Sequence, residues 1–475
     1  MGAATVPPQK ILNLQLGWPS PRLCARQGLL DGAQAALAGG NDMSPILLYG
    51  PHQGHPPLRE SLAHWLTDVY EPTAGSVTPD RLCITNGASG NLANILLKFT
   101  DPSYTRNVFM VEPTYFLACP IFEDCGFSGK LRGVPEDASD GIDLDYLRRQ
   151  LELAEIGARA SCERRGVADE PIAKRGPNYS HIYKYVVYCV PTYSNPSGCT
   201  YTLRLRERLV ALAREYDALV VSDDVYDFLS WPEDPASERD AVTKPPPRLV
   251  DIDRSMPGCM ELGNCVSNGS FSKIVGPGVR VGWSECTAAF ATQLSEVGSS
   301  SSGGAPSHLA STLVDLMLRS QWLQRHISDT LIPIYKERYY ALISSIKSQL
   351  IPQGYVIEAK NIASDASLSS AGGFFTYLRL PRGLPSAKVL AAIALKEHAL
   401  RIAFGHMFIV AGDRGSLQRA EEPQGFARCI RLCWAWHEVE GIKEAIERLA
   451  AVTADVQARV QRGEDIGAGA SIGIR

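Results

Sequence analysis

The middle of the chain alternates between short apolar runs and segments with helical spacing. "RNVFMVEPTYF" (106–116) and "KYVVYCVPTYSNPSG" (184–198) are rich in β-branched and aromatic residues and end in turn-forming residues. "TLRLRERLVALAREYDAL" (202–219) instead places apolar residues at helical spacing with charges between them. It leads directly into "VVSDDVYDFL" (220–229), an apolar run that ends in acids. Continuous apolar strands separated by helices predict a parallel sheet with helices on both faces.

The pattern changes on either side of this region. Residues 155–180 are polar, mixed in charge and turn-rich, which predicts an exposed loop inserted before a strand. From residue 328 a long amphipathic helix is expected, and "GGFFTYLRL", "LRIAFG" and "CIRLCWAW" follow it as strands of a smaller α+β unit. The predicted organisation is an N-terminal arm with part of the small domain (1–45), a large domain (46–320), a small C-terminal domain (321–460) and a flexible Gly-rich tail (461–475).

Composition narrows the possible functions. The 475 residues are 45% hydrophobic and have a net charge of −4, so nothing in the charge favours binding to nucleic acid or an anionic membrane. No run of 18 apolar residues and no secretory signal is found, so a cytoplasmic protein is expected. The twelve cysteines contain no C-x-x-C pair and no zinc pattern, which favours free thiols in a reducing compartment and no metal site.

Candidate chemistry is concentrated where the predicted strands end, because ligands of parallel sheets bind at the carboxyl ends of the strands. Tyr115, Asn195, Asp223 and Tyr226 occupy such positions. Any one of them alone is also compatible with an ordinary turn.

The segment "SNGSFSKIVGPGVRVGW" (267–283) places a lysine in small, apolar, turn-rich surroundings. Burial lowers the pKa of a lysine, and the neutral amine condenses with aldehydes to form Schiff bases. Ser270, Ser272 and Arg280 are suited to bind a phosphate, and the Gly-Pro-Gly turn can bring Arg280 near Lys273. A lysine imine together with a phosphate clamp predicts pyridoxal 5′-phosphate as cofactor.

The remaining groups that this cofactor needs are also present in the sequence. Asp223 is expected to pair with the pyridine nitrogen, and Tyr226 and Asn195 to bond the ring oxygen. "CITNGASGNLANILL" provides a second phosphate contact through Gly87, Ala88 and Ser89, at the point where a helix begins. Tyr115 is expected to stack on the ring.

Together these motifs resemble those of the class I/II aminotransferases of PLP fold type I, nearest to the aminoadipate and aromatic branch. The resemblance extends from "LNLQLGWPSP" to "RLCWAW". It implies a large domain with a mostly parallel seven-stranded sheet in an α/β/α sandwich, and a smaller α+β domain. It implies that Lys273 forms the Schiff base and shuttles the proton.

The resemblance also implies a homodimer with shared active sites, in which Tyr49 reaches the phosphate of the neighbouring subunit. Arg431 matches the arginine that binds the α-carboxylate of the substrate, and Gly17 matches a backbone position in the same pocket. The resemblance further implies ping-pong transfer of an amino group from an aromatic amino acid, 2-aminoadipate or a similar amino acid to a 2-oxo acid.

Three questions stay open at this level. The arginine that selects dicarboxylates in aspartate aminotransferases has no counterpart in "SSSGGAPSHLAS" (300–311), so Arg22 is either a distal-carboxylate partner or a surface residue. Trp18, His52 and Tyr49 could instead shape a pocket for an aromatic substrate. The same motifs also occur in lyases and synthases that perform elimination, γ-replacement or cyclisation. A DNA-binding regulator is disfavoured, because only a few residues precede the first motif.

Overall fold

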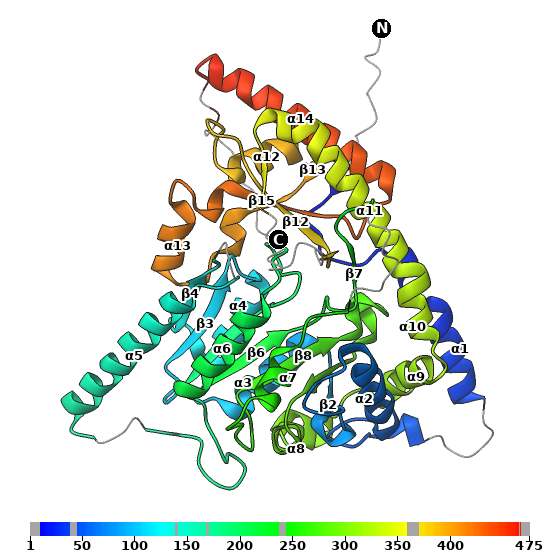
Figure 1. Ribbon diagram of the computed structural model, residues 1–475, viewed down its shortest axis with the longest axis vertical. Helices are drawn as coiled ribbons and strands as arrows, with labels where there is room; N and C mark the ends of the chain where they lie inside the picture. Colours follow the sequence, from blue (N-terminus) through cyan, green and yellow to red (C-terminus); the bar gives the residue numbers. More distant parts are fainter. Residues whose placement is uncertain are drawn as a thin grey trace.

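The computed structural model of the chain describes residues 10–38, 45–137, 141–167, 171–236, 244–358, 370–464 and 466. Two large β-sheets of different construction organise these residues. In Figure 1 the seven-stranded sheet occupies the lower part of the view and the four-stranded sheet the upper part. Most of the predicted tail lies outside the described residues, and the predicted domain boundaries stay predictions.

The larger sheet has the spatial strand order β2-β9-β8-β6-β5-β3-β4. Strand β9 runs antiparallel to both of its neighbours, and the other neighbouring pairs are parallel. This confirms the predicted mostly parallel seven-stranded sheet. Its strands are β2 (Leu82–Thr85), β3 (Asn107–Glu112), β4 (Leu131–Pro135), β5 (Tyr185–Cys189), β6 (Ala218–Asp223), β8 (Cys265–Ser270) and β9 (Gly282–Glu285).

Alternate residues of the central strands belong to two separate apolar cores. In β3, Val108 and Met110 pack into one core, whereas Phe109 and Val111 pack into the other. Because side chains of a strand point to opposite faces in turn, both faces of the sheet are buried. The helices on the first face are α2 (Pro56–Tyr70), α3 (Ala88–Phe99) and α8 (Ala288–Ser295), and those on the second are α5 (Leu144–Arg165), α6 (Leu203–Glu215) and α7 (Leu249–Ser255).

Helix α6 determines where the following strand, β6, begins and ends. Thr202 caps the helix by accepting a hydrogen bond from the backbone N–H of Leu205 at 3.1 Å. Leu205 and Leu209, one turn apart, are fully buried against the sheet. The helix ends before Asp217, whose φ of 54° is left-handed, and β6 begins at the next residue. Strand β6 then ends at Asp223.

The predicted loop at 155–180 is wrong in its first part, because α5 continues to Arg165. Asp143 caps this helix by accepting from the N–H of Tyr146 at 2.7 Å, and the helix ends where Gly166 adopts a φ of 66°. Residues 155–165 contain no proline, and Ala158 and Cys162 are buried at helical spacing. Polar composition alone therefore indicated a loop where an amphipathic helix forms.

The smaller sheet is antiparallel, with the order β10-β12-β15-β14. Two short pairs accompany it: β1 is parallel to β13, and β7 is antiparallel to β11. The strands are β1 (Leu12–Asn13), β7 (Ser230–Pro232), β10 (Val356–Ile357), β11 (Ser370–Gly372), β12 (Phe375–Arg379), β13 (Leu400–Arg401), β14 (Ala403–Phe404) and β15 (Cys429–Cys433). The remaining helices are α1 (Arg26–Leu37), α4 (Cys119–Phe122), α9 (His308–Arg319), α10 (Trp322–His326), α11 (Ile332–Ser345), α12 (Ala387–His398), α13 (Arg414–Glu421) and α14 (Val439–Gln461).

All twelve cysteines are free thiols, as expected from their spacing, and most of them are buried. Within the described ranges, no helix combines the length and the apolar character that a membrane span requires.

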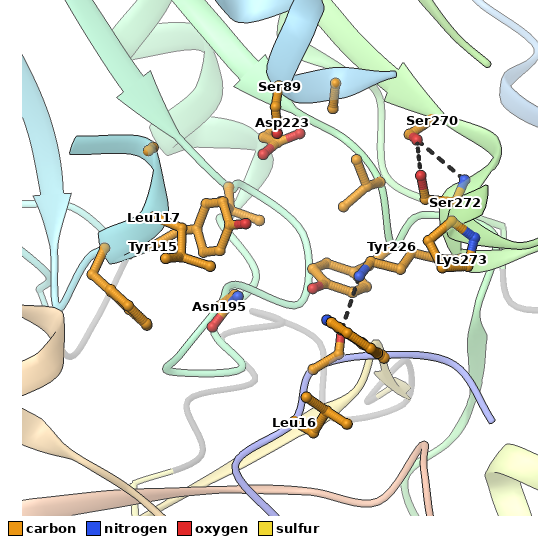
Figure 2. Close-up of a pocket in the computed structure, with 18 of the residues that line it drawn as sticks. Leu16, Ser89, Tyr115, Leu117, Asn195, Asp223, Tyr226, Ser270, Ser272 and Lys273 are labelled. Carbon is orange, nitrogen blue, oxygen red and sulfur yellow. Dashed lines mark hydrogen bonds between the residues drawn. The ribbon is translucent and has the colours of Figure 1, made fainter. Parts of the chain in front are cut away.

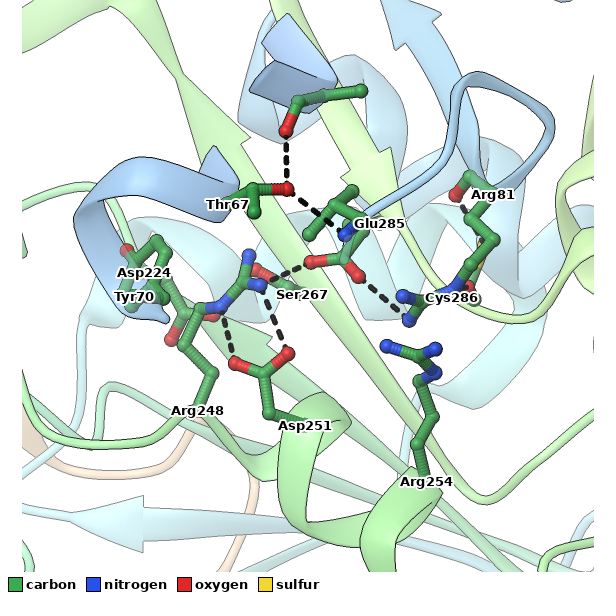
Figure 3. A network of polar contacts seen from close by, with 12 residues as sticks. Thr67, Tyr70, Arg81, Asp224, Arg248, Asp251, Arg254, Ser267, Glu285 and Cys286 are labelled. Carbon is green, nitrogen blue, oxygen red and sulfur yellow. Dashed lines mark hydrogen bonds and ion pairs between the residues drawn. The ribbon is translucent and has the colours of Figure 1, made fainter. Parts of the chain in front are cut away.

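A buried ionic network joins elements at the β2–β9 side of the large sheet (Figure 3). The guanidinium of Arg248, only 1% exposed, pairs with Asp251 at 2.9 Å and with Glu285. Glu285 also pairs with Arg81 at 2.6 Å. The ring of Tyr70 from α2 lies 3.9 Å from the Arg248 guanidinium carbon. One arginine thereby connects α2, α7 and β9.

We expect Arg248→Met to lower the free energy of unfolding by about 3–5 kcal/mol, because Glu285 and Asp251 would lose a buried counter-charge. Urea denaturation followed by circular dichroism measures this. The matched control is Arg148→Met, which breaks the solvent-exposed pair Arg148–Glu215 and should cost less than about 1 kcal/mol. Equal midpoints for the two variants would show that the buried network does not stabilise the fold.

Candidate active site

A cavity of about 440 Å³ lies at the carboxyl ends of the parallel strands, between the large sheet and the N- and C-terminal segments (Figure 2). Most of the predicted site residues line it: Gly17, Trp18, Ala88, Ser89, Tyr115, Asn195, Asp223, Tyr226, Ser270, Ser272, Lys273, Arg280 and Arg431. The side chains of Arg22, Tyr49 and His52 are exposed and do not line this cavity. Gly87 is not one of the lining residues, but its backbone lies against the guanidinium of Arg280.

Lys273 stands in the 3₁₀ turn that follows β8. Ser270 begins this turn, since its hydroxyl accepts from the N–H of Ser272 at 3.1 Å. The Nζ of Lys273 donates to the carbonyl of Gly17 at 3.0 Å (Figure 2). It also lies 5.7 Å from the ring centre of Tyr226. Burial lowers the pKa of Lys273 to about 8, although the neighbouring Asp223 works in the opposite direction. The amine is therefore available in its neutral form near physiological pH.

Asp223 is the last residue of β6 and is 8% exposed. Its Oδ2 accepts a hydrogen bond from the hydroxyl of Tyr188 at 2.8 Å, whereas its buried Oδ1 has no partner within the described part of the chain. Burial raises the pKa of Asp223 to about 7, and the adjacent Asp224 adds to this. An unpaired buried carboxylate oxygen is costly, so this atom is suited to a cationic or N–H group on a ligand.

A cradle for an anion lies at the beginning of α3. No side chain caps the helix at Gly87, so the backbone N–H groups of its first turn are available to bind an anion. The positive end of the helix dipole lies at the same place. Arg280 has a left-handed φ of 50° and donates to the carbonyls of Pro277 and Asn86 at 2.7 and 3.1 Å. A Cβ on Gly87 would lie 2.4 Å from the Arg280 guanidinium, so glycine is required where these two segments meet.

Arg431 approaches the cavity from β15 and is buried. Its NH1 donates to Oδ1 of Asn195 at 2.6 Å, and its NH2 donates to the carbonyl of Gln15. The ring of Phe375 lies 4.2 Å from the guanidinium carbon. A planar guanidinium fixed in this way is suited to bind a carboxylate with two hydrogen bonds.

Tyr188, Asn268 and Arg401 are among the cavity residues that were not predicted. Tyr188 lies near the carboxyl end of the apolar strand β5 and donates its hydroxyl to Asp223. A hydroxyl at that position of an apolar strand is the feature of the sequence that could have identified it. Asn268 is the register partner of Asp223 and donates to the carbonyl of Ala88 at 3.1 Å, which ties β8 to the first turn of α3. Arg401 lies on β13, and no local pattern in the sequence marks it.

These residues fit pyridoxal 5′-phosphate. Three groups that the cofactor needs line one cavity. They are the buried amine of Lys273 with its lowered pKa, the carboxylate of Asp223, whose Oδ1 has no partner among the described residues, and the anion cradle at Arg280, where only glycine fits at position 87. A positively charged ring nitrogen beside Asp223 would favour the ionised carboxylate.

Comparison with known proteins agrees with this geometry. A family model for aminotransferases of class I and II matches residues 23–449. The Saccharomyces cerevisiae uncharacterized protein YER152C is 36% identical over 93% of this chain and 97% of its own length. Aromatic-amino-acid aminotransferase 1 of Thermococcus litoralis is 25% identical over 93% of this chain and 87% of its own length.

Among solved structures, the α-aminoadipate aminotransferase LysN of Thermus thermophilus, complexed with N-(5′-phosphopyridoxyl)-L-leucine, has the same fold. Its TM-score is 0.69 at 24% identity, over 94% of this chain and 93% of that chain. The chain belongs to the class I and II aminotransferase family. It is an aminotransferase that depends on pyridoxal phosphate.

Reconstitution of the apoprotein with pyridoxal phosphate should follow the titration of Lys273. Only the neutral amine reacts, so the initial rate should rise about tenfold per pH unit below pH 8 and level off above it. Stopped-flow absorbance measures the rate. Nα-acetyl-lysine amide, whose only amine has a pKa of about 10.4, serves as the control over the same pH range. A protein rate that keeps rising in parallel with the control up to pH 10 would contradict the lowered pKa.

Proposed function

We propose that Lys273, Asp223, Arg280 and Arg431 are the functional centre of this aminotransferase. The observation that supports this is their convergence on one cavity, in which each faces a position suited to a different part of a cofactor–substrate pair. These four residues are best suited to transfer the amino group of an amino acid to a 2-oxo acid in two half-reactions.

The cofactor is proposed to be held at three places. Arg280, Ser270, Ser272 and the first turn of α3 bind its phosphate. Asp223 holds the ring nitrogen, with Tyr188 orienting the carboxylate through its hydroxyl. Tyr115 supplies a ring face, and Tyr226 and Asn195 supply hydrogen-bonding groups for the ring oxygen. When bound, pyridoxal phosphate withdraws electrons from the α-carbon of an attached amino acid and so acidifies its α-proton.

The chain's own residues then move that proton. Lys273, which in the structure donates to the Gly17 carbonyl, is a primary amine with a pKa lowered by burial to about 8, so its Nζ can accept the proton and return it. Arg431 binds the α-carboxylate and fixes the α-carbon within reach of Nζ. Asn195 holds the Arg431 guanidinium in that orientation.

The substrate side chain is proposed to be large and apolar or aromatic. The apolar lining of the cavity includes Leu16, Phe116, Leu117, Ile121 and Met407, together with Trp18, which is 56% exposed. An apolar wall of this kind favours aromatic side chains. The named activity of one relative, on aromatic amino acids, supports the same assignment.

We further propose a homodimer in a reducing, cytoplasmic compartment. Leu47, Leu48 and Tyr49 are 66%, 58% and 84% exposed, which is unusual for three consecutive apolar residues unless another surface covers them. Twelve free cysteines are typical of a reducing environment. A monomer in sedimentation equilibrium at micromolar concentration would contradict the proposed dimer.

Adding an aromatic amino acid alone to the holoenzyme should convert the bound cofactor once, to pyridoxamine phosphate, and then stop. Absorbance spectra and assay of the released oxo acid measure one equivalent per site. Lys273→Ala should abolish this conversion, whereas Lys347→Ala, which changes an exposed lysine, should not. Continuous release of ammonia without an added oxo acid would instead identify a lyase.

A further inference from the structure

The charges that line the active-site cavity are strongly unequal. Among the described residues, four cationic side chains line the cavity, Lys273, Arg280, Arg401 and Arg431, against the single carboxylate of Asp223. The proposed function uses three of these cations: Lys273 as the amine, Arg280 for the phosphate and Arg431 for the α-carboxylate. Arg401 has no role in that scheme.

The position of Arg401 directs its side chain to the cavity. Its neighbours Leu400 and Ile402 are 0% and 2% exposed and belong to the core, whereas Arg401 is half-buried and lines the cavity. In the described part of the chain its guanidinium has neither a hydrogen bond nor an ion pair, unlike those of Arg280 and Arg431. A half-buried guanidinium without a protein partner is free to bind a ligand anion.

Arg401 and Arg431 are positioned by the same short segment. Asn13 is the register partner of Arg401 in the β1–β13 pair, and the N–H of Leu14 donates to the Arg401 carbonyl at 2.9 Å. Gln15, two residues after Asn13, accepts from NH2 of Arg431 through its carbonyl. Both Asn13 and Gln15 line the cavity. The backbone of Arg401 and the guanidinium of Arg431 are therefore held by neighbouring residues of one segment, and both side chains line the same cavity, which suits two carboxylates of one small molecule.

We propose that Arg401 binds the distal carboxylate of a dicarboxylic substrate, while Arg431 binds its α-carboxylate. This rests on the proposed function and assigns one of its two substrates to the class of short dicarboxylic amino acids and 2-oxo acids. Arg22, which the sequence offered for this role, is exposed and outside the cavity. An aromatic substrate would use the apolar wall instead and leave Arg401 in water, where a long arginine side chain is stable.

The test compares a diacid with a monoacid of the same length on the holoenzyme. Isothermal titration calorimetry measures the dissociation constants of glutarate and pentanoate, which bind without reacting. Arg401→Leu should weaken glutarate binding 10- to 100-fold relative to pentanoate, because charge-assisted hydrogen bonds to the second carboxylate are lost. Arg401→Lys should restore part of the difference, since it keeps the charge but not the planar fork. Arg26→Leu, on the exposed surface of α1, is the matched control.

A glutarate-to-pentanoate ratio that is the same in wild type and Arg401→Leu would overturn the proposal. A tenfold change of that ratio in Arg22→Leu, with none in Arg401→Leu, would assign the distal carboxylate to Arg22 instead. Pentanoate binding shows within each variant that the site is folded.

A kinetic readout separates this inference from the proposed function. For wild type and variant, kcat/KM of the half-reaction is measured with a dicarboxylic and with an aromatic amino acid. Arg401→Leu should lower the ratio of the dicarboxylic to the aromatic kcat/KM at least tenfold. If wild type converts neither amino acid but glutarate still binds through Arg401, the proposed function fails and the anion site stands. If both are converted and the ratio does not change, the inference about Arg401 fails alone.

Discussion

The active site depends on the removal of two opposite charges from water at adjacent strand ends. Asp223 ends β6, and Lys273 follows the neighbouring strand β8 by one turn. Burial brings the pKa of the carboxyl up to about 7 and that of the amine down to about 8. Each group is thereby placed near the pH at which it can change its protonation state, and Oδ1 of Asp223 has no hydrogen-bond partner among the described residues.

The rest of the large sheet keeps these two groups in place. Asp224, the residue after Asp223, faces the opposite way and accepts from the hydroxyl of Ser267 at 2.5 Å, on the side of the buried ionic network. Burial raises the pKa of Asp224, and the positive charge of Arg248 in that network acts to lower it. The consecutive acids thus have separate tasks: one faces the cavity, and the other fixes the strand end behind it. Short apolar strands covered on both faces leave the pair little freedom to move.

Local signals explain which parts of the site the sequence could predict. Lys273, Ser270 and Arg280 lie within one segment, and Asp223 and Tyr115 follow apolar runs that end in turns, so each position could be identified from its own neighbours. Arg401 could not, because its place in the cavity depends on the pairing of β1 with β13, which joins the two ends of the chain. The helix at 155–165 was missed for a different reason: its apolar face is narrow, and polar composition outweighed the spacing of Ala158 and Cys162. The strand order likewise depends on long-range pairing and was not predicted. The expectation of seven strands followed from the family resemblance, whereas the parallel character followed from continuous apolar strands.

Chemical trapping of the holoenzyme tests most directly whether Lys273 is the residue that binds the cofactor. Borohydride reduces a Schiff base between pyridoxal phosphate and a lysine to a stable secondary amine, and mass spectrometry of the digested protein locates it. A phosphopyridoxyl group is expected on Lys273 alone, at about one per chain, and none after the protein has first been converted by an amino acid. A label on another lysine, or spread over several surface lysines with Lys273 unmodified, would contradict it.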